Sequence, residues 1–231
     1  MFDVRRLGPR DLGLILDLQE RIRASLADPD VFQTSTPEFV SYCLADGGLC
    51  YGVNHGTGTV AYRMVYFPRD RDFNLAKDTP LPPAEYGRVA HWDTIAVLPE
   101  WRGHGLARLM NGRALDDVAG LDIRHLCATS SPQNPAGVGS LMRAGFRPVR
   151  LVRKFGGKLR FLFYRPTPGA WPVKETTATK PPPERCLPFS DTAGLDQAFR
   201  EGWVGVDIDT DRTGPGLRLR RHPLPFTGQR I

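Results

Sequence analysis

The hydrophobic positions near the start of the chain recur at a helical period. They are Leu12, Ile15, Leu16, Ile22 and Leu26. This spacing predicts an amphipathic helix from Pro9 to Ala27, after a short strand at residues 2–6. Thr36-Pro37-Glu38 then predicts the start of a second helix, because threonine caps helix ends and proline suits the first helical turn.

Further along, apolar runs of strand length alternate with helical patterns. Two strands at 49–54 and 59–67 are joined by a turn at 55–58. The other predicted elements are a strand at 88–97, a helix at 105–118, a strand at 123–129, a helix at 134–144 and a hairpin of strands at 146–154 and 158–165. Mixed helices and hairpins of this kind are typical of an α/β (α+β) fold.

The pattern changes after residue 166. Residues 167–190 are rich in proline, threonine and lysine, which predicts a linker or strap. Residues 191–231 could hold one helix (191–201) and two short strands (203–207 and 217–221), too little to fold alone. We expect this C-terminal extension to pack on the main domain of residues 1–166 or on a partner subunit, which would make a homodimer.

Composition narrows the class of protein. The 231 residues are 41% hydrophobic and 24% charged, as in an ordinary globular protein. No apolar run is long enough to span a membrane, and the N-terminus lacks the pattern of a secretory signal. The four cysteines form no CxxC pair, so we expect free thiols, no metal and a cytoplasmic location.

The net charge of +6 raises the question of an anionic partner. The arginines are spread along the whole chain among acidic residues, and no nucleic-acid-binding motif is present. Nucleic acid is therefore not the expected partner. A basic surface that attracts an anionic cofactor is the simpler interpretation.

Candidate chemistry appears at a glycine-containing junction between a predicted strand and a predicted helix, Arg102-Gly103-His104-Gly105-Leu106-Ala107. Unpaired N–H groups at a helix start, together with the helix dipole, bind phosphate. The junction is neither a Walker loop nor a dinucleotide fingerprint, because GxxxxGK[ST] is absent and Arg108 stands where GxGxxG needs glycine.

The residues around this junction resemble the GNAT acyltransferase superfamily. Arg102, Gly105 and Ala107 match that family's (Arg/Gln)-x-x-Gly-x-(Gly/Ala) signature, and Asn134 with the segment 141–146 (LMRAGF) resembles its second motif. The order of predicted elements over residues 1–166 is also similar. The resemblance implies a mixed, mostly antiparallel sheet flanked by helices, and transfer of an acyl group from acyl-CoA, most simply acetyl-CoA as co-substrate, to an amine.

The resemblance also implies a set of cofactor-binding residues. Residues Arg102, Gly103, His104, Gly105, Leu106 and Ala107 would hold the pyrophosphate. The strands at 88–97 and 123–129 would splay apart to admit the pantetheine arm, beside Ala96 and Val97, with an N–H near Val97 polarising the thioester carbonyl. Asn134 would contact the cofactor arm, although its position equally suits a helix cap.

Acyl transfer to an amine needs a neutral amine, so a general base is expected. His91 and Asp93 stand at i and i+2 of one predicted strand and should point to the same face. The resemblance places a base at these positions, with Asp93 our first choice and His91 the second. The alternatives are a core histidine and an aspartate that binds backbone at a bulge.

The tyrosine that often protonates the leaving thiolate in this family is replaced by Leu141. Ser140 or Tyr164 could serve instead, or the thiolate could leave without help. The charged segment 68–87 suggests a polar acceptor, most simply a small-molecule primary amine. A protein or peptide amine, and a non-catalytic acyl-CoA sensor, are the alternatives.

Overall fold

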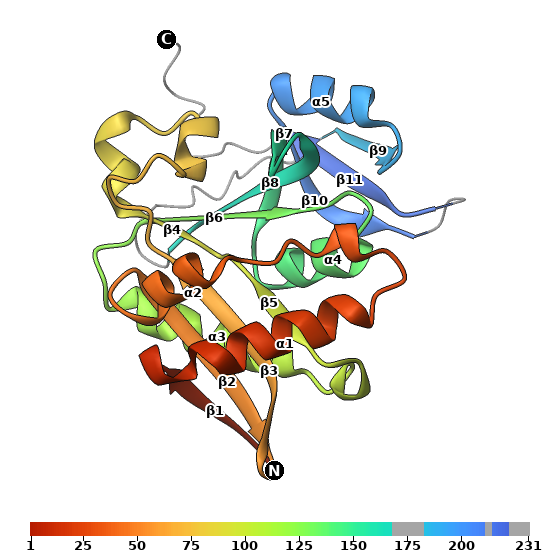
Figure 1. Ribbon diagram of the computed structural model, residues 1–231. Helices are drawn as coiled ribbons and strands as arrows, with labels where there is room; N and C mark the ends of the chain where they lie inside the picture. Colours follow the sequence, from red (N-terminus) through yellow and green to blue (C-terminus); the bar gives the residue numbers. More distant parts are fainter. Residues whose placement is uncertain (168–182, 211–213, 222–231) are drawn as a thin grey trace. The chain divides into compact units, whose positions relative to one another are not determined.

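The computed structural model describes residues 1–167, 183–210 and 214–221 (Figure 1). The described chain forms two units, and each unit combines two segments that are separate in the sequence. Unit 1 comprises Met1–Asn74 and Gly87–Ile123, and unit 2 comprises Leu75–Tyr86 and the chain from Arg124 onward. The charged segment 68–87 is therefore shared between them.

The strands of unit 1 form an antiparallel sheet. Strand β2 (Gly48–His55) pairs with β1 (Phe2–Leu7) on one side and with β3 (Gly58–Tyr66) on the other. Strands β4 (Val89–His91) and β5 (Ile95–Val97) both pair with β3. The predicted arrangement of two strands joined by a short turn at 55–58 is confirmed.

The single strand predicted at 88–97 is wrong, because residues 92–94 interrupt it. Tyr66 pairs with His91 and Arg63 pairs with Ile95, so three residues of this strand face two of β3. That count is a β-bulge, and the Met64 N–H donates to the Thr94 carbonyl within it at 2.8 Å. The i, i+2 spacing of His91 and Asp93 therefore does not place their side chains on the same face of a regular strand, although the sequence predicted that it would.

Helices cover both faces of this sheet. In order they are η1 (Pro9–Asp11), α1 (Leu12–Ala24), η2 (Pro29–Val31), α2 (Pro37–Leu44), η5 (Pro99–Trp101) and α3 (Leu106–Ala119). The predicted helix Pro9–Ala27 is thus a 3-10 turn followed by a helix that ends at Ala24. The predicted cap is confirmed, since Thr36 Oγ1 accepts the Phe39 N–H at 3.3 Å.

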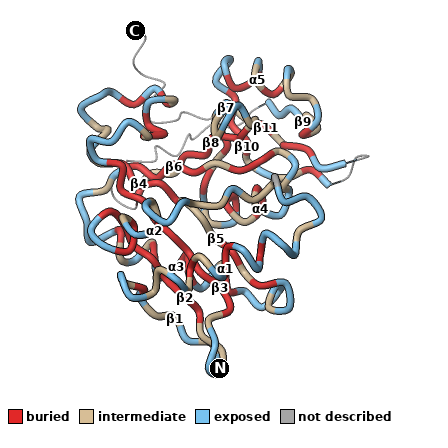
Figure 2. The backbone as a smooth tube through the Cα atoms, in the orientation of Figure 1, coloured by how far each residue is buried: buried red, intermediate tan, exposed pale blue. Residues whose placement is uncertain are grey.

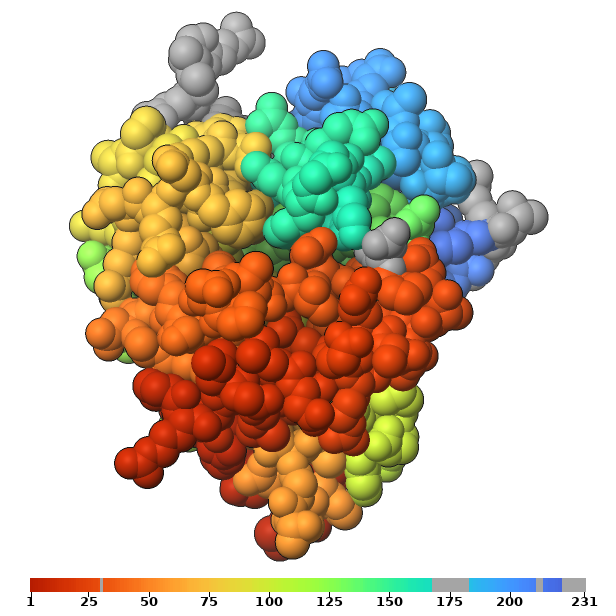
Figure 3. All heavy atoms as spheres, in the orientation of Figure 1, coloured from red at the N-terminus to blue at the C-terminus, as the bar shows by residue number. Residues whose placement is uncertain are grey.

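The core of unit 1 lies where these helices meet the strands. Its fully buried side chains include Ile15 and Leu18 of α1, Val40 of α2, and Met64 of β3. Figure 2 shows β2 and β3 buried over most of their length, whereas α1 and α2 alternate between buried and exposed positions. In the space-filling view, the red and orange atoms of α1 and α2 lie in front of this sheet (Figure 3).

Unit 2 is built on a second group of antiparallel strands. Strand β8 (Lys158–Pro166) pairs with β6 (His125–Ser130) and with β7 (Arg147–Lys154). Helix α4 (Pro135–Arg143) connects β6 to β7, and two 3-10 turns, η3 (Leu75–Asp78) and η4 (Pro83–Arg88), lie in the segment predicted as a connection. Both units therefore match the implied mixed fold with a mostly antiparallel sheet flanked by helices.

The C-terminal residues add a small three-stranded sheet to unit 2. Strand β11 (Gly216–Arg221) pairs with β9 (Glu184–Pro188) and with β10 (Trp203–Asp209), and α5 (Thr192–Arg200) precedes β10. Strand β9 falls inside the predicted linker of residues 167–190, whose part at 168–182 lies outside the described residues. Among the helices of the described residues, none is both long and apolar enough to cross a membrane.

This C-terminal segment packs on the main strands of unit 2. The ring of Phe161 in β8 lies 5.4 Å from that of Phe189 and 6.3 Å from that of Phe199. A side chain at Gly205 would collide with Pro148 of β7, at 2.4 Å from its Cγ, so glycine permits close packing of β10 on β7. Unit 2 thus includes residues on both sides of the predicted boundary at residue 166.

Candidate functional site

The glycine junction forms the turn between η5 and α3. Gly103 and Gly105 have φ angles of +82° and +75°, a left-handed conformation that favours glycine. A Cβ at Gly103 would meet no atom within 4 Å, and one at Gly105 would meet only Arg108 Nη2 at 4.0 Å. The glycines therefore serve the backbone conformation and leave open space in front of the turn.

The backbone of this turn presents free donors. The first helical hydrogen bond runs from the Leu109 N–H to the Gly105 carbonyl at 3.0 Å. Within the described part of the chain, the N–H groups of residues 103–108 have no acceptor. Unpaired N–H groups at the positive end of a 14-residue helix are suited to an anion.

Two side chains tie the turn back to its own unit. Arg102 Nε donates to the Val97 carbonyl of β5 at 3.2 Å. His104 Nδ1 lies 3.0 Å from the Arg102 carbonyl and 3.3 Å from the Trp101 carbonyl, so the proton is on Nδ1. The predicted residues 96 and 97 are thus joined to residues 102–107 by the Arg102–Val97 bond, and the side chains of Arg102 and His104 are exposed.

The candidate base Asp93 lies inside the bulge of residues 92–94 and is half-buried. Its Oδ1 accepts the Thr94 hydroxyl at 2.9 Å, and the side chain also accepts the Thr94 backbone N–H. Burial raises the pKa of Asp93 above its ordinary value, although the Thr94 hydrogen bonds and the charge of Arg63 act in the opposite direction. A carboxylate with a raised pKa is a stronger base.

The second candidate, His91, is buried among aromatic rings. Its imidazole lies edge-on to Tyr66 at 5.1 Å and to Phe73 at 5.4 Å between centroids. Only 1% of its surface is exposed. Burial raises the pKa of Tyr66, and the charge of Asp93 acts in the same direction.

Sequence reasoning missed a buried cation beside the bulge. Arg63 of β3 has no exposed surface, and its guanidinium lies 4.7 Å from the centre of the Trp92 ring. The Trp92 indole N–H donates to Asn111 Oδ1 of α3 at 3.0 Å, which fixes that ring. The available signal was an arginine inside the otherwise apolar run of residues 60–67.

The remaining predicted residues belong to unit 2. Asn134 caps α4, its Oδ1 accepting the Gly137 N–H at 2.9 Å, which confirms the helix-cap alternative. Its contact with a cofactor arm stays a prediction. Leu141, at the family's tyrosine position, is 8% exposed in α4, and Ser140 is half-buried.

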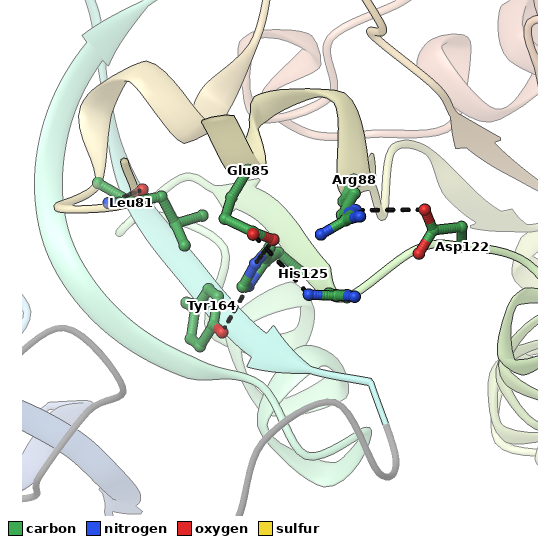
Figure 4. A network of polar contacts seen from close by, with 8 residues as sticks. Leu81, Glu85, Arg88, Asp122, His125 and Tyr164 are labelled. Atoms are coloured by element: carbon green, nitrogen blue, oxygen red, sulfur yellow. Dashed lines mark hydrogen bonds and ion pairs between the residues drawn. The ribbon is translucent and has the colours of Figure 1, made fainter. Parts of the chain in front are cut away.

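Tyr164, the other candidate acid, takes part in a buried polar network (Figure 4). Its hydroxyl lies 2.9 Å from His125 Nδ1, and His125 Nε2 lies 3.2 Å from Glu85 Oε2. Burial raises the pKa of Tyr164 above its ordinary value, which weakens it as an acid. The network links η4 to β6 and β8, so it also has a structural role.

Comparisons with known proteins identify the family. The model of the Acetyltransferase (GNAT) family matches residues 19–146, more than half of the chain. No protein among the curated sequences matches the chain.

Three solved structures illustrate the likeness. Arabidopsis thaliana NAA60, in complex with acetyl-CoA, is 14% identical over 73% of this chain and 100% of its own, with a TM-score of 0.58. The ribosomal-protein-S18-alanine N-acetyltransferase from Escherichia coli is 14% identical over 72% and 94% (TM-score 0.54). Aminoglycoside acetyltransferase AAC(6')-Ib, in complex with coenzyme A and kanamycin, is 13% identical over 74% and 96% (TM-score 0.55).

At these identities the structures establish the fold alone, whereas the family model extends over both sequence motifs, from α1 to the start of β7. The glycine turn at α3, the capped helix α4 and the antiparallel strands that carry them agree with that match. The chain therefore belongs to the GNAT acetyltransferase family.

Proposed function

We propose that the protein is an acetyl-CoA-dependent N-acetyltransferase whose acceptor is a primary amine on a small molecule. The observation that carries the proposal is the turn of residues 102–105, where open space and unpaired N–H groups precede α3. These donors fit the diphosphate of coenzyme A, because they need acceptors and nothing in their own unit supplies any.

The backbone of residues 102–107 would hold the diphosphate. Arg102 adds positive charge beside it, while its bond to the Val97 carbonyl links the turn to β5. Asn134 and an N–H near Val97 are the proposed contacts to the cofactor arm and the thioester carbonyl. When bound, acetyl-CoA supplies an activated acyl group, and the chain supplies binding, orientation and a proton acceptor.

Asp93 is the proposed general base. An amine is protonated at neutral pH and cannot attack a carbonyl until its nitrogen loses a proton. The half-buried Asp93 carboxylate, with its raised pKa, would accept that proton directly or through water. His91 is the alternative acceptor, and D93N and H91N variants compared across pH would distinguish the two.

The small-molecule acceptor rests on the polar character of the segment after β3. This segment carries Arg69, Asp70, Arg71 and Asp72 in succession, exposed at the surface. Among the fold neighbours, one structure contains kanamycin and another is named for a ribosomal protein, so a protein amine is the competing acceptor class.

The deciding experiment measures thiol release from acetyl-CoA in the presence of separate panels of small amines and of peptides with free N-termini. We expect saturable release with at least one small polyamine, aminoglycoside or amino acid, together with the acetylated product by mass spectrometry. Turnover with peptides alone would assign the protein to the protein acetyltransferases. Saturable acetyl-CoA binding without turnover on either panel would instead assign it to sensors.

A further inference from the structure

A cluster of aromatic side chains surrounds Tyr66 where β3 ends. Between ring centroids, Tyr66 lies 4.9 Å from Phe39 and 5.9 Å from Tyr42, both in α2. Phe73 lies 6.3 Å from the same ring, and His91, which pairs with Tyr66 in the sheet, lies 5.1 Å from it. Tyr66 and His91 are buried, whereas the other three are half-buried. These five side chains, the aromatic cluster, thus connect the alternative base His91 to the surface of unit 1.

Arg71 lies over one of these rings. Its guanidinium carbon is 3.7 Å from the centre of the Tyr42 ring, and the arginine is exposed. The Tyr42 hydroxyl donates to the Phe67 carbonyl at 3.3 Å, which fixes the ring beneath the guanidinium. The Arg71 backbone N–H donates to the Pro68 carbonyl at 2.9 Å, which closes a turn. Stacking occupies the face of a guanidinium and leaves the N–H donors at its edge for a planar anion.

The Arg71 guanidinium has no anionic partner in the described part of the chain. Asp70 and Asp72 flank it in the sequence, yet neither forms an ion pair with it. Arg69, by contrast, donates from Nη2 to the Asp46 carbonyl at 2.8 Å. A positioned guanidinium whose edge is unused is suited to a carboxylate, which accepts two N–H bonds at once.

Arg71 is linked to the proposed proton acceptors through the aromatic cluster. Phe73, two residues after Arg71, has its ring 5.4 Å from that of His91. His91 directly precedes the bulge that holds Asp93. A guanidinium repels an ammonium that approaches these bases, unless the same molecule also carries a negative charge. A carboxylate paired with Arg71 would therefore admit the amine, and an apolar side chain would lie against the half-buried rings.

We propose that Arg71 binds a carboxylate of the acceptor, which makes the substrate an amino acid with an apolar or aromatic side chain. This inference rests on the proposed acetylation of a small-molecule amine. The amine nitrogen loses its proton to Asp93 or His91 and forms the amide bond as the thiolate leaves, while the carboxylate stays unchanged. Arg71 selects the substrate and contacts none of the reacting atoms.

The test compares phenylalanine, tyrosine, leucine and methionine with their carboxamides as acceptors. Wild-type kcat/KM should be higher for the acids. R71Q should lower it about tenfold to hundredfold for the acids but less than about threefold for the amides, because hydrogen bonds to charged groups contribute that factor. R71K keeps the charge without the planar fork and should lie between. Equal effects of R71Q on acids and amides, or no effect on either, would overturn the inference.

R69Q is the matched control, because it removes an equal charge from the same segment, and its guanidinium already bonds the Asp46 carbonyl. The ratio of kcat/KM for each acid to that for its amide should change less than about twofold in R69Q, as expected for an exposed charge without direct contact. Taking this ratio within each variant cancels the different basicities of the two amines. A change as large as that of R71Q would mean that the ratio reports only the charge of the segment, and the inference would fall.

A binding measurement separates this inference from the proposed function. Each of the four acids is titrated calorimetrically into wild type and R71Q saturated with coenzyme A. Saturable binding that R71Q weakens, without turnover of any acceptor, would support the carboxylate site and refute the acetyltransferase proposal. Turnover of amides and acids alike would retain the acetyltransferase and overturn the carboxylate site. Absence of both binding and turnover for all four acids would overturn it as well.

Discussion

Replacement of Gly105 gives the sharpest test of the phosphate-binding turn. Its φ of +75° costs a residue with a Cβ about 1–2 kcal/mol, and the new Cβ of G105A would meet only the end of Arg108 at 4.0 Å. The cost is therefore conformational and not steric. If binding needs this conformation, acetyl-CoA affinity should fall about fivefold to thirtyfold in G105A.

G105E adds a negative charge at the same place. Two like charges about 6 Å apart at an effective dielectric constant of about 20 repel by ~3 kcal/mol, which is more than a hundredfold in affinity. G105E should therefore bind at least a hundredfold more weakly than wild type, and the loss should shrink as salt is added.

A matched control exists in the β7–β8 hairpin. Gly156 has a φ of +76°, and a Cβ there would meet nothing within 4 Å, so G156A carries the same backbone cost away from the turn. Calorimetric titration with acetyl-CoA and urea unfolding are measured on all three variants. G156A should lose about 1–2 kcal/mol of stability with unchanged affinity, whereas G105A, in which the free turn relaxes and is strained only on binding, should lose affinity and less stability. Affinity of G105E within twofold of wild type would refute the assignment of this turn to phosphate.

Three further predictions concern the base, the core and pH. D93N should lower kcat/KM by a factor of about 10²–10⁴ with unchanged acetyl-CoA affinity. The activity of the wild type should disappear as pH falls through the raised pKa of Asp93. Equal pH–activity profiles for wild type and D93N would exclude Asp93 as the base. F161A should lower the free energy of unfolding by about 3–5 kcal/mol in urea titrations, because the Phe161 ring is fully buried against the C-terminal segment. A loss below about 1 kcal/mol would mean that this segment is not part of the core. The hydrogen bond from Arg5 lowers the pKa of Asp11 in the folded protein. The ionised Asp11 therefore stabilises the fold at pH values above the ordinary carboxyl pKa, and this stabilisation is lost as pH falls through the lowered pKa. Unfolding of D11N measured against pH should not show this loss.

Local sequence patterns determined the elements whose causes are local. The helical period predicted α1, and the Thr36-Pro37 pair predicted the start of α2 with its cap bond. The glycines of the 102–107 segment indicated an unusual backbone before a helix, and both have left-handed φ angles. These features depend on residues within one or two turns of each other, so short stretches of sequence suffice to predict them. The family signature is equally local.

Only the tertiary structure decided what depends on pairing between distant residues. The bulge at 92–94 exists because three residues of one strand face two of β3, a count that neither strand reveals alone. That register turned an expected regular strand into a bulge that holds Asp93 against Thr94, and Trp92 of the same bulge lies over Arg63. The burial of Arg63, the sharing of segment 68–87 between two units and the strand β9 have the same origin. Each results from long-range packing, in which distant partners supply the burial and charge that set the chemistry of a side chain.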